Sequence, residues 1–125
     1  SSLYETKPWG KSDQPDFLNQ VIQIQVDKTP QACLITLSSI ERQMGRKRNE
    51  KWGARIIDLD LLYVNDQLIN TEKLILPHPG IPNRRFVLVP MAEIAPDFIH
   101  PYLLKNQKQL LEECMDTLEV KVLHT

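Results

Sequence analysis

The sequence predicts an α+β fold, with helices packed on a mostly antiparallel sheet. Apolar and polar residues alternate in 17–26, as they do in a half-buried strand, and 56–64 is an apolar run of strand-forming residues that contains two carboxylates. Apolar stripes at helical spacing follow Thr29-Pro30 and occupy the C-terminal region. Six of the nine prolines fall between Pro77 and Pro101, which favours short helices and turns there. With 125 residues, the chain is expected to form one domain, 1–125.

The first strand is expected to run from Phe17 to Val26, with Ile22 and Ile24 on its buried face. A helix is expected to start here, with Thr29 at its N-cap and Pro30 at its first helical position. One apolar stripe then predicts which face of this helix is buried, and Gly45 is a plausible C-cap. The stripe comprises Cys33, Leu37, Ile40 and Met44.

The second strand, 56–64, is expected to turn at Asn65-Asp66 and to return through 67–69, because both turn residues tolerate positive φ angles. Segment 86–95 predicts one or two short helical pieces, broken near Pro90. A final amphipathic helix is indicated by Leu110, Leu111, Cys114, Met115 and Leu118, and a last short strand by Val120 and Val122.

Composition narrows the class of protein. The formal net charge of -1 gives no general attraction to nucleic acid or membrane. No apolar run approaches the ~20 residues of a membrane span, and Ser1 to Gly10 lacks the blocks of a signal peptide. Cys33 and Cys114 lie far apart in apolar contexts, which is typical of reduced core cysteines. A cytoplasmic protein without nucleic-acid or membrane partners is therefore expected.

Two carboxylates stand out in the second strand. Asp58 and Asp60 are separated by two positions, so a strand would place both on one face, with Ile57, Leu59 and Leu61 buried behind them. Neighbouring anions repel unless a cation lies between them. A hard divalent ion, held by the carboxylates and by a substrate's phosphates, is the usual solution.

A basic cluster precedes these carboxylates, formed by Arg42, Arg46, Lys47, Arg48, Lys51 and Arg55. A solvated charged loop is the ordinary explanation for any one member. Beside a metal site, however, several arginines are the groups needed to hold a polyphosphate. Arg55 is the strongest candidate because it lies closest to Asp58, whereas Arg46 and Arg48 are expected to close over a bound nucleotide.

Other residues suggest a second substrate. His78 lies between two prolines and could hydrogen-bond a phosphate, although a lone histidine usually has no such role. Phe17 and Asn19 share a strand face, where a ring and an amide could hold a flat heterocycle; ordinary packing explains that pair at least as well. Trp9 and Trp52 are more often half-buried anchors than ligand platforms.

These motifs resemble one known family. Segment 51–62, with its Gly53-Ala54-Arg55-Ile56-Ile57-Asp58-Leu59-Asp60 core, resembles the signature of 6-hydroxymethyl-7,8-dihydropterin pyrophosphokinase. Further matches lie in 13–19, 76–79, 83–86 and 93–96, so the resemblance covers most of the chain up to about Pro101. It implies a ferredoxin-like α/β sandwich. It also implies transfer of pyrophosphate from ATP to 6-hydroxymethyl-7,8-dihydropterin, with release of AMP, in folate biosynthesis.

The resemblance also implies roles for individual residues. Two magnesium ions would be bound by Asp58 and Asp60. The ATP side would comprise Arg55, His78 and Arg84 at the phosphates, Trp52 and Glu41 near the nucleotide, and the loop residues Arg46 and Arg48. The pterin would lie between Phe17 and Phe86, hydrogen-bonded by Asn19, in a pocket lined by Thr6 and by the Lys7–Trp9 stretch.

The sequence departs from this family at its start. The family begins with a strand ending in Gly-Ser-Asn and a helix, and neither has a counterpart ahead of Ser1. Three explanations are open: further residues in the molecule, pairing supplied by a second copy, or an inactive fragment. The complete domain is expected to be a monomer, and a truly truncated chain could dimerise. A nucleotide-binding module is the alternative function.

Overall fold

The computed structural model describes residues 1–7, 16–45 and 57–124. The chain divides into two compact units: unit 1 comprises Ser1–Ile24 and Pro79–Thr125, and unit 2 comprises Gln25–His78. The described residues form three α-helices, and all their strand pairings are antiparallel. This confirms the α+β class and is consistent with a ferredoxin-like fold. No helix within the described ranges has the length and apolar character to cross a bilayer.

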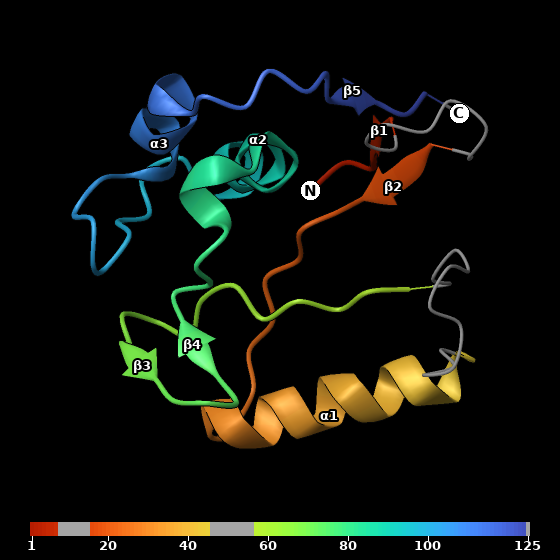
Figure 1. Ribbon diagram of the computed structural model, residues 1–125, viewed down its shortest axis with the longest axis vertical. Coiled ribbons are helices and arrows are strands. Elements are labelled where there is room, and N and C mark those ends of the chain that lie inside the picture. Colours follow the sequence, from red (N-terminus) through yellow and green to blue (C-terminus); the bar gives the residue numbers. More distant parts are fainter. Residues whose placement is uncertain (8–15, 46–56, 125) are drawn as a thin grey trace. The chain divides into compact units, whose positions relative to one another are not determined.

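Unit 1 contains a three-stranded sheet in the order β2-β1-β5 (Figure 1). The central strand β1, Tyr4–Thr6, pairs with β2, Phe17–Asn19, and with β5, Lys121–Val122. Tyr4 lies opposite Asn19 on one side and opposite Val122 on the other. The predicted last strand is thus confirmed, whereas β1 was not foreseen.

Helix α2, Arg85–Ile94, follows a short 3₁₀ helix, η1, at Ile81–Asn83. It packs against α3, Gln107–Glu113, and contacts β1. The core between these elements includes Ile81, Leu88, Met91 and Leu110, all buried.

The predicted break near Pro90 is wrong, because α2 runs through it. A proline inside a helix has no N–H to donate four residues back, in this case to the carbonyl of Phe86. Pro90 itself is fully buried. The buried ring adds apolar surface to the unit 1 core, which favours a helix that continues through Pro90 although this bond is missing.

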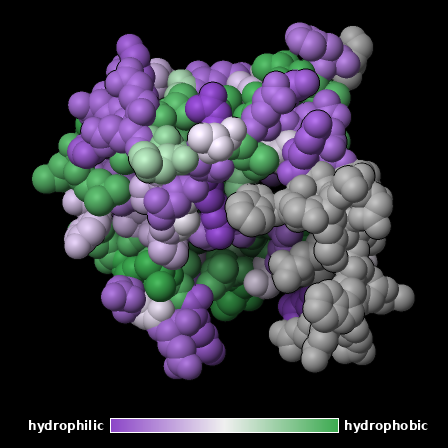
Figure 2. All heavy atoms as spheres, turned by 45° about the horizontal axis from the view of Figure 1, so that its top comes forward, coloured by the Kyte–Doolittle hydropathy of each residue, from purple (hydrophilic) through white to green (hydrophobic). Residues whose placement is uncertain are grey.

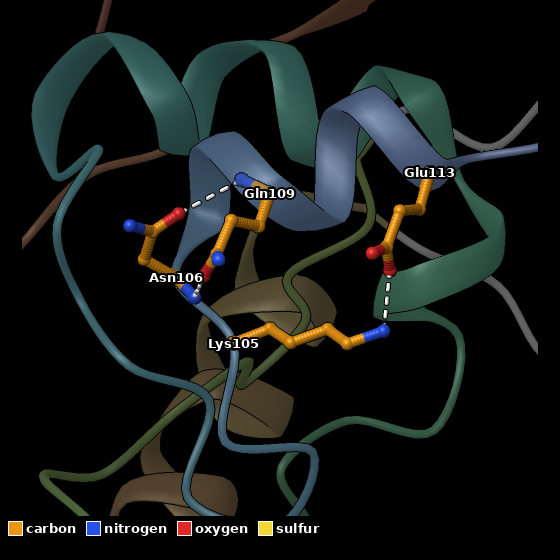
Figure 3. Close-up of polar contacts among 4 residues, drawn as sticks. All are labelled: Lys105, Asn106, Gln109 and Glu113. Carbon is orange, nitrogen blue, oxygen red and sulfur yellow. Dashed lines mark hydrogen bonds and ion pairs between the residues drawn. The ribbon is translucent and has the colours of Figure 1, made fainter.

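Helix α3 begins with a capping box (Figure 3). The Asn106 side chain accepts from the Gln109 N–H at 2.8 Å, and the Gln109 side chain accepts from the Asn106 N–H at 2.9 Å. Lys105 and Glu113 form an ion pair beside it, with Nζ and Oε2 2.6 Å apart. The helix ends at Glu113, so the predicted extension through Leu118 is wrong; Met115 is 90% exposed and belongs to no helix.

Unit 2 contains α1, Pro30–Gln43, with the expected ends. The Thr29 hydroxyl accepts from the Ala32 N–H at 3.1 Å, and Gly45 has a positive φ of 93° just after the C-cap. These local predictions are confirmed.

The predicted apolar stripe of α1 is only partly correct. Cys33 is buried and Leu37 half-buried, but Ile40 and Met44 are exposed. Glu41 is buried in their place. Its carboxylate has a backbone hydrogen-bond partner, described below, which makes that burial tolerable.

The second strand was predicted incorrectly. Among the described residues, 57–64 belong to no sheet, and β3, Ile69–Asn70, pairs instead with β4, Ile75–Leu76. The turn itself is confirmed, since Asn65 has a φ of 50° and the Gln67 N–H donates to the Val64 carbonyl at 3.1 Å. Turn chemistry is local, whereas a strand requires a ladder partner, and 57–64 has none within the described ranges.

The first predicted strand is also shorter than expected. β2 ends at Asn19, and Ile22, Ile24 and Val26 are 68%, 62% and 47% exposed. Their alternation describes one apolar face, but no described strand pairs with 20–26. Figure 2 shows hydrophobic residues scattered among hydrophilic ones on one face of the molecule.

Candidate functional site

The β1–β2 pairing brings together three of the residues expected at the pterin. Thr6 lies directly opposite Phe17, and the Asn19 amide donates to the Thr6 hydroxyl at 2.9 Å. Thr6 is only 4% exposed, whereas Phe17 is 49% exposed. The hydrogen bond fixes the Asn19 amide, and the exposed ring of Phe17 is available for stacking.

The same sheet face is tied to α2 by a carboxylate that sequence reasoning did not single out. Glu93 accepts from the Ser2 N–H at 2.8 Å, from the Ser2 hydroxyl at 2.9 Å, and from the Tyr4 hydroxyl. The hydrogen bond to Glu93, together with burial, raises the pKa of Tyr4 to about 12. The bond from Tyr4, followed by those from Ser2, lowers the pKa of Glu93. The sequence did offer one sign of Glu93, because it lies in the 93–96 segment that resembles the family, but that match assigned it no role.

Arg84 and Phe86 lie at the N-terminal end of α2. The Arg84 guanidinium carbon lies 5.9 Å from the centre of the Phe86 ring, within the range of a cation–π contact. A Cβ built on Gly80 would lie 2.7 Å from Arg84 Nε and 2.8 Å from its Cζ. The absence of a side chain at Gly80 therefore leaves the space that this guanidinium occupies.

A cavity of about 630 Å³ lies beside this pair. Its lining combines the start of α2 with the segment after α3: Asn83, Arg84, Phe86, Met115, Asp116 and Leu118. The volume is in the range of small-molecule sites. The contribution of 115–118 was missed by sequence reasoning, which placed this segment in a helix.

In unit 2, the two expected metal ligands, Asp58 and Asp60, are both exposed. Ile57, before them, and Leu59, between them, are half-buried rather than buried. This alternation matches the expected two-residue period even though no ladder forms. The Leu59 N–H donates to Glu41 Oε2 at 2.8 Å, so the backbone between the two aspartates is held by the buried Glu41.

These two carboxylates fit a magnesium site. Both are exposed hard oxygen donors, and Mg²⁺ is commonly bound by one or two carboxylates with substrate phosphates and water. Within the described ranges, no group of three or more His, Cys, Asp or Glu side chains could hold a metal.

The backbone of His78 also lies near this segment, because its N–H donates to the Leu62 carbonyl at 2.9 Å. His78 is half-buried. His100, which carried no assignment, has a structural role: its Nδ1 accepts from the N–H groups of Tyr102 and Leu103 at 3.2 and 3.0 Å. Burial lowers the pKa of His100, so the neutral ring suits this acceptor role.

The remaining predicted site residues lie outside the described residues; they are Trp9, Arg46, Arg48, Trp52 and Arg55. Their roles stay predictions. The described site residues belong to two groups. Unit 1 contains Thr6, Phe17, Asn19, Arg84 and Phe86, and unit 2 contains Glu41, Asp58, Asp60 and His78.

Comparison with known proteins supports the resemblance. The family model for 7,8-dihydro-6-hydroxymethylpterin-pyrophosphokinase matches residues 1–96. The 2-amino-4-hydroxy-6-hydroxymethyldihydropteridine pyrophosphokinase of Aquifex aeolicus is 40% identical over 113 residues, covering 90% of this chain and 71% of that protein. The protein of the same name from Synechocystis sp. is 43% identical over 113 residues, covering 90% of this chain and 57% of that protein.

A larger relative is also similar. The folic acid synthesis protein fol1 of Schizosaccharomyces pombe is 42% identical over 118 residues, which are 94% of this chain and 16% of that protein. The chain thus spans between 57% and 71% of the length of the two bacterial relatives and a small part of the yeast one. The matched region includes the sequence motifs, the carboxylate pair and the start of α2. The chain belongs to the 7,8-dihydro-6-hydroxymethylpterin-pyrophosphokinase family.

Proposed function

We propose that this chain transfers the terminal pyrophosphate of ATP to the hydroxymethyl group of 6-hydroxymethyl-7,8-dihydropterin, releasing AMP in folate biosynthesis. Family membership carries this proposal, because the matched relatives are named for this pyrophosphokinase. The described residues support it with groups suited to each substrate: exposed carboxylates for a metal–polyphosphate, and an exposed phenylalanine beside a fixed amide for a flat ring.

The ring of the pterin is proposed to stack on Phe17 and Phe86. The Asn19 amide donates one hydrogen to Thr6, which leaves its carbonyl oxygen and its second hydrogen for the edge of the heterocycle. Thr6 holds this amide in one orientation, so the polar edge of the ring is recognised by a group that does not have to be ordered on binding.

The phosphates are proposed to meet positive charge from two parts of the sequence. Arg84 offers a planar fork of donors beside Phe86, and His78 offers a ring N–H. Arg46, Arg48 and Arg55, on the sequence side of the carboxylate pair, are proposed to complete the phosphate contacts.

Asp58 and Asp60 are proposed to hold two magnesium ions with ATP. When bound, the ions neutralise charge on the phosphate oxygens. The pterin hydroxyl oxygen forms a bond to the β-phosphorus, and the bond from that phosphorus to the oxygen bridging the α- and β-phosphates breaks. AMP leaves with the bridging oxygen, and the hydroxyl proton passes to a nearby base. One of the two aspartates is proposed as that base, and no covalent enzyme intermediate is needed.

The test is nucleotide analysis after incubation with ATP, Mg²⁺ and the reduced pterin. We expect AMP to appear only when the pterin is present. ADP, or no conversion, would refute the proposal for this chain. A second assay follows the pterin diphosphate directly, so that an ATP-hydrolysing contaminant is not counted as transfer.

A further inference from the structure

Helix α2 begins with local chemistry that should weaken its first turn. Its N-cap, Arg84, makes no side-chain capping bond, and no acidic residue lies in the first turn. Arg84 and Arg85 instead place two positive charges at the positive end of the helix dipole. Pro90 adds to this, because it has no N–H for the carbonyl of Phe86. Another part of the chain must therefore hold this end.

Asp116 supplies what the first turn lacks. Its Oδ2 accepts from the Arg85 N–H at 3.0 Å, across 31 positions of sequence. It thus satisfies one of the free N–H groups of α2 and brings a negative charge to the positive end of the helix. A capping residue from the helix's own sequence normally does both.

The carboxylate of Asp116 is itself held in place. Its Oδ1 accepts from the Leu118 N–H at 3.0 Å, so each oxygen has a backbone donor. Asp116 is half-buried. It follows α3 by only a few residues, and α3 is fixed by its capping box and by the buried Leu110. The anchor on Arg85 therefore lies three positions after a helix that is held at its own start.

This anchor acts on the residues that face the cavity. Arg85 lies between Arg84 and Phe86, and these two line the cavity together with Asp116, Met115 and Leu118. Fixing the Arg85 N–H fixes the backbone from which both neighbouring side chains leave. Met115, Asp116 and Leu118 line the same cavity as Phe86, so their position affects the space open to its ring.

We infer that Asp116 is a positioning residue, which holds the start of α2 so that Phe86 is preordered for the pterin ring. The inference rests on the proposed function, since it assigns Phe86 to the pterin. Asp116 touches neither substrate in this scheme. Its effect is to reduce the ordering that binding would otherwise require.

The test compares three variants by steady-state kinetics and thermal unfolding. Asp116→Ala removes both acceptors, and we expect the KM for the pterin to rise about tenfold, with kcat at saturating pterin within about threefold of the parent. Asp116→Asn keeps one acceptor oxygen, so its KM for the pterin should lie between that of the parent and that of Asp116→Ala. Glu119→Gln is the matched control, because Glu119 is an exposed acid near Asp116 in sequence, and its Oε1 lies 3.6 Å from Lys121 Nζ. Its KM should match the parent.

A purely structural role predicts a different result. Loss of folded molecules would lower kcat and leave the KM of the remaining enzyme unchanged. That pattern, or a pterin KM within twofold of the parent in both Asp116 variants, would overturn the inference. If Asp116→Ala does not fold, Asp116→Asn decides alone. A parent protein that neither binds the pterin nor forms AMP would refute the proposed function, and the inference with it; an active parent with unaffected variants refutes the inference alone.

Discussion

Replacing Glu41 with alanine should destabilise unit 2. Glu41 is 8% exposed, and its Oε2 accepts from the Leu59 N–H at 2.8 Å. Hydrogen bonds to charged groups contribute about 1.5–3 kcal/mol, and the half-buried Leu59 N–H can regain some water, so the lower half of that range applies: about 2 kcal/mol. For a chain of this size, that loss corresponds to a fall in Tm of about 8 °C.

Two further variants separate the hydrogen bond from the charge. Glu41→Gln keeps an acceptor for Leu59 but makes a neutral bond, so we expect a loss of about 1 kcal/mol. Glu72→Ala removes an exposed acid of the same unit and should change stability by less than about 0.5 kcal/mol. Urea unfolding followed by circular dichroism measures all three. If Glu41→Ala unfolds at the same urea concentration as Glu72→Ala, the buried Glu41 contact does not stabilise the fold.

Three other perturbations have defined outcomes. Asp58→Ala should abolish AMP formation because it removes a proposed metal ligand; near-normal turnover would contradict the metal assignment. Gly80→Ala should keep stability, since its φ of -80° suits alanine, but should displace the Arg84 side chain and raise the KM for ATP severalfold; an unchanged KM would remove Arg84 from the phosphate contacts. The pKa of Tyr4 is raised from 10.0 to about 12, so its contribution to stability is full below pH 10.0 and is lost as pH rises towards 12. The pKa of Glu93 is lowered from 4.5, so its contribution is present above pH 4.5 and is lost as pH falls. Tyr4→Phe should reduce both dependences in unfolding measurements, and an unaltered pH profile would count against the pair.

Features set by local chemistry could be predicted from the sequence. Thr29 and Pro30 begin α1 as expected because a hydroxyl acceptor and a fixed φ act within one turn. Asn65 makes the expected turn for the same kind of reason. The family followed from short sequence motifs, and the family model matches residues 1–96.

Features that depend on distant partners could not be predicted. The alternation through Ile22 and Ile24 is that of a strand, but strand formation requires a neighbouring chain segment, and periodicity does not report whether one exists. Glu41 was expected near a nucleotide, and its bond to the Leu59 backbone depends on how α1 packs. Asp116 was assigned to a helix; only the pairing of two remote segments shows that it caps another one.

The sheet order of unit 1 has a consequence for synthesis of the protein. Its central strand β1 pairs with β5, so this pairing cannot form until the residues of β5 have been synthesised. Unit 2, by contrast, is a continuous stretch, Gln25–His78, whose contacts are all available sooner. On the ribosome, unit 2 is therefore expected to fold first. Until β5 emerges, β1 lacks the strand that pairs with it on that side in the folded structure, so we expect a chaperone to matter most in this interval.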